Sequence, residues 1–127
     1  MNQDATLSDN TTRILQLKQK VQEFVDEREW GKYHNLKNLS MSIAVEAGEL
    51  MELFQWLDES GSIEAMKSRE QRTRVKEELA DVLMYCLDMA NVLNIDVTKA
   101  VLEKIRKNQS KYPVAQVRGR YRKYTEI

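Results

Sequence analysis

The chain has few of the residues that interrupt helices or cross-link a fold. Its 127 residues include four glycines, one proline and one cysteine. So few helix-breaking residues predict long helices, and the single cysteine, Cys86, cannot form a disulfide within the chain. Because Cys86 lies in an apolar stretch, we interpret it as a small buried hydrophobic residue. A lone thiol also fits a cytoplasmic protein.

The chain also lacks an excess of charge of either sign, since 20 basic residues balance 20 acidic residues. This balance argues against a nucleic acid or an anionic membrane as the main partner. No apolar run approaches the ~18 residues that span a bilayer, and the polar residues 1–10 do not resemble a secretory signal. We therefore expect a cytoplasmic protein with one domain.

What the chain does have is apolar residues at helical spacing along four segments, without the alternation of a strand. The predicted helices are 11–28, 38–57, 68–93 and 97–110. Ser68 and Gln71 form a predicted capping box at the start of the third helix, and Asp96 is a predicted N-cap of the fourth. Residues 58–68 are interpreted as a polar connector. The predicted fold class is all-α.

The predicted partition has three parts: a disordered N-terminus at 1–10, a helical domain at 11–113 and a basic tail at 114–127. Within the domain, the third helix carries apolar residues around most of its circumference, which is typical of a buried helix. Four helices in so small a domain would not cover it completely. We therefore expect a homo-oligomer whose interface uses the remaining apolar surface.

Two glutamates interrupt apolar stripes. On the second predicted helix, Glu46 lies within about 60° of every member of a stripe, and Glu78 does the same on the third helix. Each has an acidic residue three positions further on, Glu49 and Asp81, on the same side of its helix. The stripes are Leu39, Ile43, Leu50, Leu53 and Leu57, and Val75, Val82, Tyr85, Met89 and Leu93.

The four carboxylates admit three interpretations: solvated surface charges, ion pairs with basic residues of another helix, or ligands of a metal. Removing a lone carboxylate from water costs several kcal/mol, so their place on apolar stripes favours a cation between the helices. Oxygen ligands suit Mg²⁺ or Mn²⁺. The only histidine, His34, lies in a predicted loop, which disfavours zinc and the Glu-x-x-His pairs of a di-iron bundle.

A magnesium site with few protein ligands indicates a substrate that carries phosphates, because Mg²⁺ is commonly held by one or two carboxylates together with substrate phosphates. The chain contains no Walker A loop to bind them. Basic and amide side chains on the fourth helix, Lys104, Asn108 and Lys111, are candidates for that role. A solvated basic face remains the alternative.

At these residues the chain resembles the all-α nucleoside triphosphate pyrophosphohydrolases, the MazG-like superfamily, whose signature is E-E-x-x-E followed by E-x-x-D. Here it reads Val45-Glu46-Ala47-Gly48-Glu49 and then Glu78-Leu79-Ala80-Asp81, so Val45 replaces the first glutamate. The wider pattern is similar to the dCTP pyrophosphatase branch over about 11–125. It includes Glu29-Trp30, His34, Lys37-Asn38-Leu39, Glu52-Leu53-Phe54-Gln55-Trp56, Lys104, Asn108, Lys111-Tyr112-Pro113, Arg118-Gly119 and Lys123-Tyr124-Thr125.

The resemblance implies an enzyme that uses Mg²⁺, or Mn²⁺ in its place, to convert a nucleoside triphosphate to the monophosphate and pyrophosphate in nucleotide-pool cleansing. It implies a four-helix bundle, assembled as a dimer or a dimer of dimers, with sites that borrow residues from a neighbouring subunit. The roles it implies are metal binding by Glu46, Glu49, Glu78 and Asp81, base activation of water by Glu46 or Glu49, nucleobase binding by Trp30, His34, Asn38, Trp56 and Tyr85, and phosphate binding by Lys104, Asn108 and Lys111.

Two other functions remain open at this point. One is a helical oligomeric interaction module without catalysis. The other is a sister enzyme of the same superfamily, such as a dimeric dUTPase or phosphoribosyl-ATP pyrophosphohydrolase. The preferred base is also open, since dCTP, a modified cytosine nucleotide or dATP would each fit.

Overall fold

The computed structural model describes residues 3–121 and 123–126, and these residues form helices and no strand. The prediction of an all-α fold is therefore confirmed. The elements are η1 (Gln3–Thr6), α1 (Ile14–Glu27), η2 (Trp30–Lys32), α2 (Leu36–Glu52), α3 (Glu59–Ala65), α4 (Arg69–Leu93), α5 (Val97–Lys111), α6 (Val114–Val117) and η3 (Tyr124–Glu126). The predicted terminal segments include residues 1, 2, 122 and 127, which lie outside the described residues.

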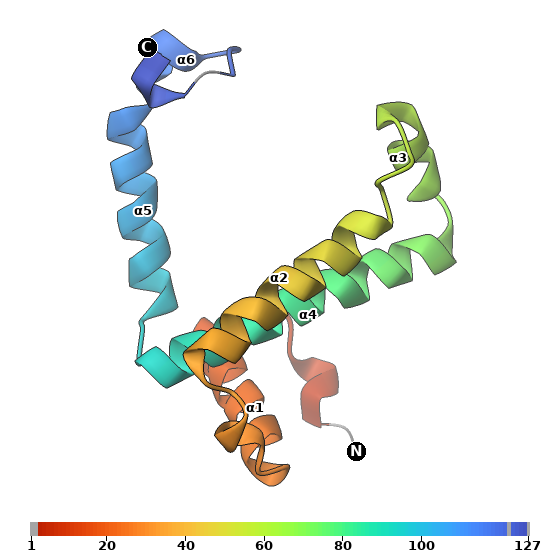
Figure 1. The fold of residues 1–127 in the computed structure, drawn as a ribbon, viewed down its shortest axis with the longest axis vertical. Coiled ribbons are helices and arrows are strands. Elements are labelled where there is room, and N and C mark those ends of the chain that lie inside the picture. The colour runs from red at the N-terminus through yellow and green to blue at the C-terminus, as the bar shows by residue number, and fades with distance from the viewer. Residues whose placement is uncertain (1–2, 122, 127) are drawn as a thin grey trace. The chain divides into compact units, whose positions relative to one another are not determined.

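The chain divides into two compact units, Met1–Asn94 and Ile95–Ile127. In the first unit α2 and α4 run antiparallel and side by side, as Figure 1 shows, while α1 packs against α4 and η2. The hydrophobic core is small: its buried members are Val21, Val25, Leu39 and Ala90. Leu39 is the most deeply buried, because its position on the stripe of α2 points it toward α4.

Side-chain caps define where α2 and α4 begin. The Asn35 side chain accepts a hydrogen bond from the Asn38 backbone N–H at 2.9 Å and starts α2. The Ser68 hydroxyl accepts one from the Gln71 N–H at 3.4 Å and starts α4. The Ser68 half of the predicted capping box is therefore present. A left-handed Asn94 at φ 53° ends α4.

Two sequence predictions about this unit were wrong. The polar connector contains a helix, α3, because the Asp58 side chain accepts a hydrogen bond from the Gly61 N–H at 2.7 Å and caps its first turn. The second helix ends at Glu52, five residues earlier than predicted, and the chain then turns. Leu57 therefore lies outside the helix and is 42% exposed rather than a member of its buried stripe.

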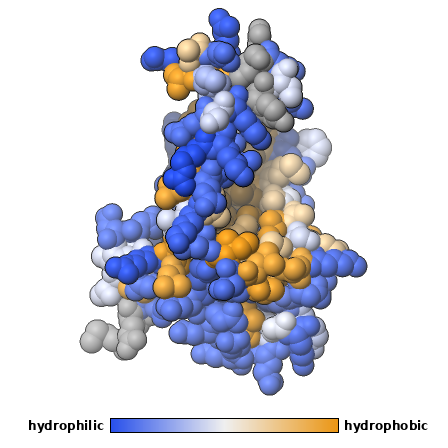
Figure 2. All heavy atoms as spheres, turned by 90° about the vertical axis from the view of Figure 1, so that its left-hand side faces the viewer, coloured by the Kyte–Doolittle hydropathy of each residue, from blue (hydrophilic) through white to orange (hydrophobic). Residues whose placement is uncertain are grey.

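Within the single chain, the third predicted helix, α4, is only partly covered, as expected, but the burial predicted for its cysteine is wrong. Cys86 is exposed, whereas a buried residue was predicted. Leu83 is 54% exposed and Leu93 is 45% exposed, because α1 and α2 cover only part of the helix circumference. Hydrophobic residues, orange in Figure 2, accordingly lie exposed among hydrophilic ones.

The second unit contains α5, α6 and η3. Asp96 caps α5 as predicted, since its carboxylate accepts a hydrogen bond from the Lys99 N–H at 2.9 Å. Pro113 follows the end of α5 and begins the short α6. Among the described residues, no helix has both the length and the apolar character that crossing a membrane requires.

Candidate metal centre

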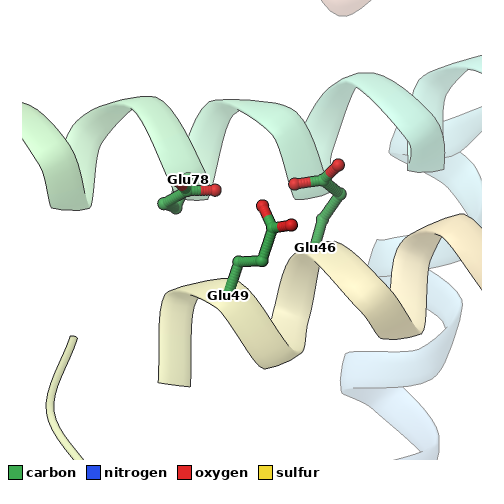
Figure 3. Close-up of side chains that lie close together, drawn as sticks. All are labelled: Glu46, Glu49 and Glu78. Atoms are coloured by element: carbon green, nitrogen blue, oxygen red, sulfur yellow. The ribbon is translucent and has the colours of Figure 1, made fainter. Parts of the chain in front are cut away.

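Three of the four predicted carboxylates converge between α2 and α4. Each of Glu46, Glu49 and Glu78 offers one oxygen, and these oxygens lie within 4.8 Å of one another. Figure 3 shows Glu46 and Glu49 reaching from α2 toward Glu78 on α4. The convergence follows from helix geometry, because residues three apart share a side of α2 and the antiparallel α4 presents Glu78 to that side.

Burial leaves two oxygens of this cluster without partners. Glu46 Oε2 and Glu78 Oε2 are buried and accept no hydrogen bond. None of the ion pairs formed within residues 3–121 and 123–126 involves Glu46, Glu49 or Glu78. Among the described residues, the cluster is therefore a concentration of negative charge that no lysine or arginine neutralises by a direct contact.

The cluster changes the acidity of its members. The pKa of Glu46 is raised from 4.5 to about 7, first by burial, then by the hydrogen bond and charge of Glu49, and then by the charges of Asp81 and Glu78. The pKa of Glu78 is also raised, by burial and then by Glu49, Asp81 and Glu77. Both shifts have the same two causes, partial desolvation of the carboxylates and their crowding with like charges.

Asp81 stands apart from the three glutamates. It is not one of the residues whose oxygens lie within 4.8 Å of one another. Its charge nevertheless raises the pKa of both Glu46 and Glu78, so it belongs to the same electrostatic environment. Its predicted role as a ligand remains a prediction.

Three of the predicted base-binding residues gather about two turns further along α4. The ring of His34 lies 6.1 Å from that of Trp30 and 6.2 Å from that of Tyr85, centroid to centroid. Trp30 also meets the Phe24 ring edge-on at 5.7 Å. Tyr85 follows Glu78 by seven residues, or roughly 10 Å along the helix axis. We call Trp30, His34 and Tyr85 the aromatic cluster.

The other predicted base-binding residues lie differently. The Asn38 side chain donates a hydrogen bond to the Tyr33 carbonyl at 2.9 Å and so ties the η2 loop to α2. Trp56 follows the far end of α2 and is 88% exposed. The 17 residues of α2 separate Trp56 from His34, which corresponds to about 25 Å along the axis. One chain therefore does not bring Trp56 to the aromatic cluster.

The predicted phosphate-binding residues Lys104, Asn108 and Lys111 all lie on α5, in the second unit, and are exposed. Asn108 accepts a hydrogen bond from the Tyr112 N–H through its backbone carbonyl. Their predicted contact with phosphates remains a prediction.

Asp88 on α4 was not among the site residues predicted from the sequence. Asp88 is 3% exposed and is the only polar residue in the described part of the chain that is this deeply buried. Its carboxylate lies 2.5 Å from His34 Nδ1. A signal was present in the sequence, because Asp88 interrupts the apolar run Leu87 to Ala90 in a chain with one histidine.

Comparisons with known proteins agree with this arrangement. The sequence profile of the MazG-like family matches residues 41–127, which include all three converging glutamates. The chain belongs to the MazG-like family. Among solved structures, a pyrophosphatase from Archaeoglobus fulgidus is similar with a TM-score of 0.75 and 38% identity, over 85% of this chain and 99% of that one.

Curated relatives of this MazG-like chain include proteins named dCTP pyrophosphatase 1. The human protein is 39% identical over 105 residues, and the bovine protein is 42% identical over 106 residues. Each match covers 83% of this chain and 62% of the relative. The chain thus spans about three fifths of the length of these relatives.

Proposed function

We propose that this MazG-like protein is a nucleoside triphosphate pyrophosphohydrolase that uses a divalent cation, Mg²⁺ or Mn²⁺. The observation that carries the proposal is the convergence of Glu46, Glu49 and Glu78, with two buried oxygens left without partners. Such oxygens fit a hard cation, which would satisfy them and offset their mutual repulsion. The names of the relatives, dCTP pyrophosphatase 1 and pyrophosphatase, support the reaction and suggest a cytosine substrate.

Two neighbouring groups of residues along α4 would serve different steps of this reaction. Glu46, Glu49 and Glu78 would hold the cation, with Asp81 as a further ligand, and the cation supplies neutralisation of phosphate charge when bound. Glu49 is exposed, so its carboxylate would be accessible to accept a proton from the attacking water. The aromatic cluster would stack the base, and Lys104, Asn108 and Lys111 would contact the phosphates or pyrophosphate.

The distance between Trp56 and the aromatic cluster supports a site shared between two copies of the chain. If both take part in base binding, the about 25 Å along α2 requires Trp56 to come from a partner. An exposed apolar stripe on α4, formed by Leu79, Leu83, Cys86 and Leu93, gives a second copy a surface to cover. These residues recur at spacings of four, three and seven, which places them on one side of the helix.

The proposed assembly is therefore a homo-oligomer of MazG-like helical bundles, a dimer or a dimer of dimers. The helical domain at 11–113 and the basic tail at 114–127 are part of the same proposal. A cytoplasmic location and the absence of a nucleic-acid partner, expected from composition, belong to it too.

The reaction is tested by measuring pyrophosphate release from the common and several modified nucleoside triphosphates with Mg²⁺. We expect release of one pyrophosphate and one monophosphate per substrate, with dCTP or a modified cytosine nucleotide as the preferred substrate. Release of single phosphates would indicate another reaction. A folded, metal-loaded protein that turns over no triphosphate would refute the proposal.

Cation binding should depend on pH because a cation and a proton compete for Glu46. With a pKa of about 7 for Glu46, Mg²⁺ affinity should rise about tenfold between pH 6 and pH 8. The Glu46→Gln variant cannot titrate at this position, so its weaker affinity should lack this part of the pH dependence. Calorimetric titration of both proteins across this range measures the difference. Equal pH dependence in both would contradict the assignment of Glu46.

The stability of the metal-free protein should show the opposite trend. The raised pKa means that folded Glu46 retains its proton between about pH 4.5 and pH 7 while the unfolded chain has lost it. The contribution of Glu46 to the free energy of unfolding therefore falls as pH rises through this window. Denaturant unfolding of the wild type and of Glu46→Gln, both with a chelator, should show a wild-type deficit that grows toward pH 7 and then levels.

A further inference from the structure

The contact between His34 and Asp88 determines which ring nitrogen of His34 carries a proton. A carboxylate accepts hydrogen bonds and does not donate them. Because Asp88 lies 2.5 Å from His34 Nδ1, that nitrogen must be the donor. A neutral imidazole has one N–H only, so Nε2 is then left as an acceptor.

The free nitrogen of His34 is open to a ligand. The structure gives Nε2 no hydrogen-bond partner among the described residues. It is not sealed from solvent either, since the side-chain atoms that are both buried and without a partner in the described part of the chain are Glu46 Oε2 and Glu78 Oε2. The His34 side chain as a whole is 18% exposed, and that of Asp88 is 4% exposed. The buried carboxylate thus lies behind the ring, and the accessible acceptor faces away from it.

The surroundings of this acceptor suit a planar ligand. The rings of Trp30 and Tyr85 lie 6.1 and 6.2 Å from that of His34, and Trp30 is 41% exposed. An aromatic ring can stack on a base, and a fixed acceptor next to it can form a hydrogen bond with a donor on the edge of that base. Cytosine and adenine present an exocyclic amino group, which is a donor, where uracil and thymine present a carbonyl oxygen.

We propose that Asp88 is a positioning residue that holds His34 with Nε2 as an acceptor, so that His34 selects bases with an exocyclic amino group over bases with a carbonyl oxygen at that position. The proposal rests on the proposed function for the identity of the ligand as a nucleotide. It adds a physical reason for the choice of base. A carbonyl oxygen opposite Nε2 would leave two acceptors facing each other, and neither would have a hydrogen-bond partner.

The proton position can be measured directly because His34 is the only histidine in the chain. Protein labelled with ¹⁵N-histidine gives one pair of ring signals, and we expect a protonated Nδ1 and an unprotonated Nε2 in the wild type. Two nitrogens protonated at pH 8, or a proton on Nε2 alone, would overturn the proposal. The measurement needs no turnover, so it stands even if the protein hydrolyses no triphosphate.

Base selection is tested on the same signals with dCMP and dUMP as probes, which differ in an amino group and a carbonyl oxygen. We expect dCMP to shift the Nε2 signal at concentrations at which dUMP does not. Equal shifts, or no shift with either, would overturn the base-reading role. If neither reaction nor nucleotide binding occurs while the expected tautomer is present, the proposed function fails separately from the role of Asp88 in fixing that tautomer.

Substitution of Asp88 distinguishes a role in positioning the His34 proton from a role in folding alone. Asp88→Asn keeps the shape but can donate to Nδ1, which moves the proton of His34 to Nε2. We expect the dCTP-to-dUTP ratio of kcat/KM to fall at least tenfold, whereas the exposed control Asp9→Asn should leave it unchanged. Equal losses for both substrates would show that Asp88 serves only folding. His34→Ala should remove the selection, and adding Asp88→Asn to it should change the ratio no further.

Discussion

Replacing Glu49 with glutamine should lower kcat for the preferred triphosphate by about 10²–10⁴-fold, the usual contribution of a general base. The amide keeps the size of the side chain but loses the charge that would hold a cation and the basicity that would accept a proton. Glu49 is exposed and its backbone lies within α2, so the fold has little reason to change. Steady-state pyrophosphate release, with Mg²⁺ in large excess, measures the effect.

The control for this experiment is Glu52→Gln, one turn further along α2. Glu52 is exposed like Glu49 but is not one of the residues whose oxygens converge. Its variant should retain the wild-type kcat within about twofold, because surface substitutions away from a site have small effects. Comparable losses of kcat in both variants would mean that turnover depends on the overall negative charge of α2 and not on the converging carboxylates.

Mixing two defective variants should restore activity if Trp56 acts on the site of a partner subunit. In a dimer of Trp56→Ala with Glu49→Gln, one site receives intact carboxylates from the first subunit and an intact tryptophan from the second. The other site carries both defects. Random exchange makes about half of the dimers mixed, so about a quarter of all sites should be intact. Activity at subsaturating substrate, before and after subunit exchange, measures the gain.

The size of the gain depends on how much Trp56 contributes to binding. Stacking of a base on an aromatic ring is worth roughly 1–3 kcal/mol, so Trp56→Ala alone should lower kcat/KM by roughly five- to 150-fold, mainly through KM. Mixing Glu49→Gln with the double variant Trp56→Ala/Glu49→Gln provides the control, because no mixed site then has intact carboxylates. Activity that stays at the average of the two separate proteins would contradict a shared site.

The helical periodicity of the sequence correctly predicted features that depend only on which side of one helix a residue occupies. The stripe on α2 predicted that Leu39 would be buried, and it is 1% exposed. The same periodicity predicted that Glu46 and Glu78 would lie on the inner faces of their helices, and their oxygens do converge. Such predictions succeed because the angular position of a side chain around its helix is fixed by its place in the sequence.

Features that depend on tertiary contacts were not predictable in this way. Cys86 was expected to be buried because its neighbours are apolar, but no described element of the chain covers that side of α4. The separation of Trp56 from Trp30 depends on where α2 ends and which way the chain runs. The Asp88 contact joins residues 54 positions apart, and no local period relates them.

A divalent cation held jointly by Glu46, Glu49 and Glu78 is the central feature of the proposed site. Calorimetric titration of the purified protein with Mn²⁺, in the presence of a non-hydrolysable triphosphate at pH 8, tests it most directly. We expect saturable binding in the wild type and much weaker binding in Glu46→Gln, with the same helical content in both proteins by circular dichroism. Equal Mn²⁺ binding by the two proteins, or no binding by the wild type, would contradict the claim.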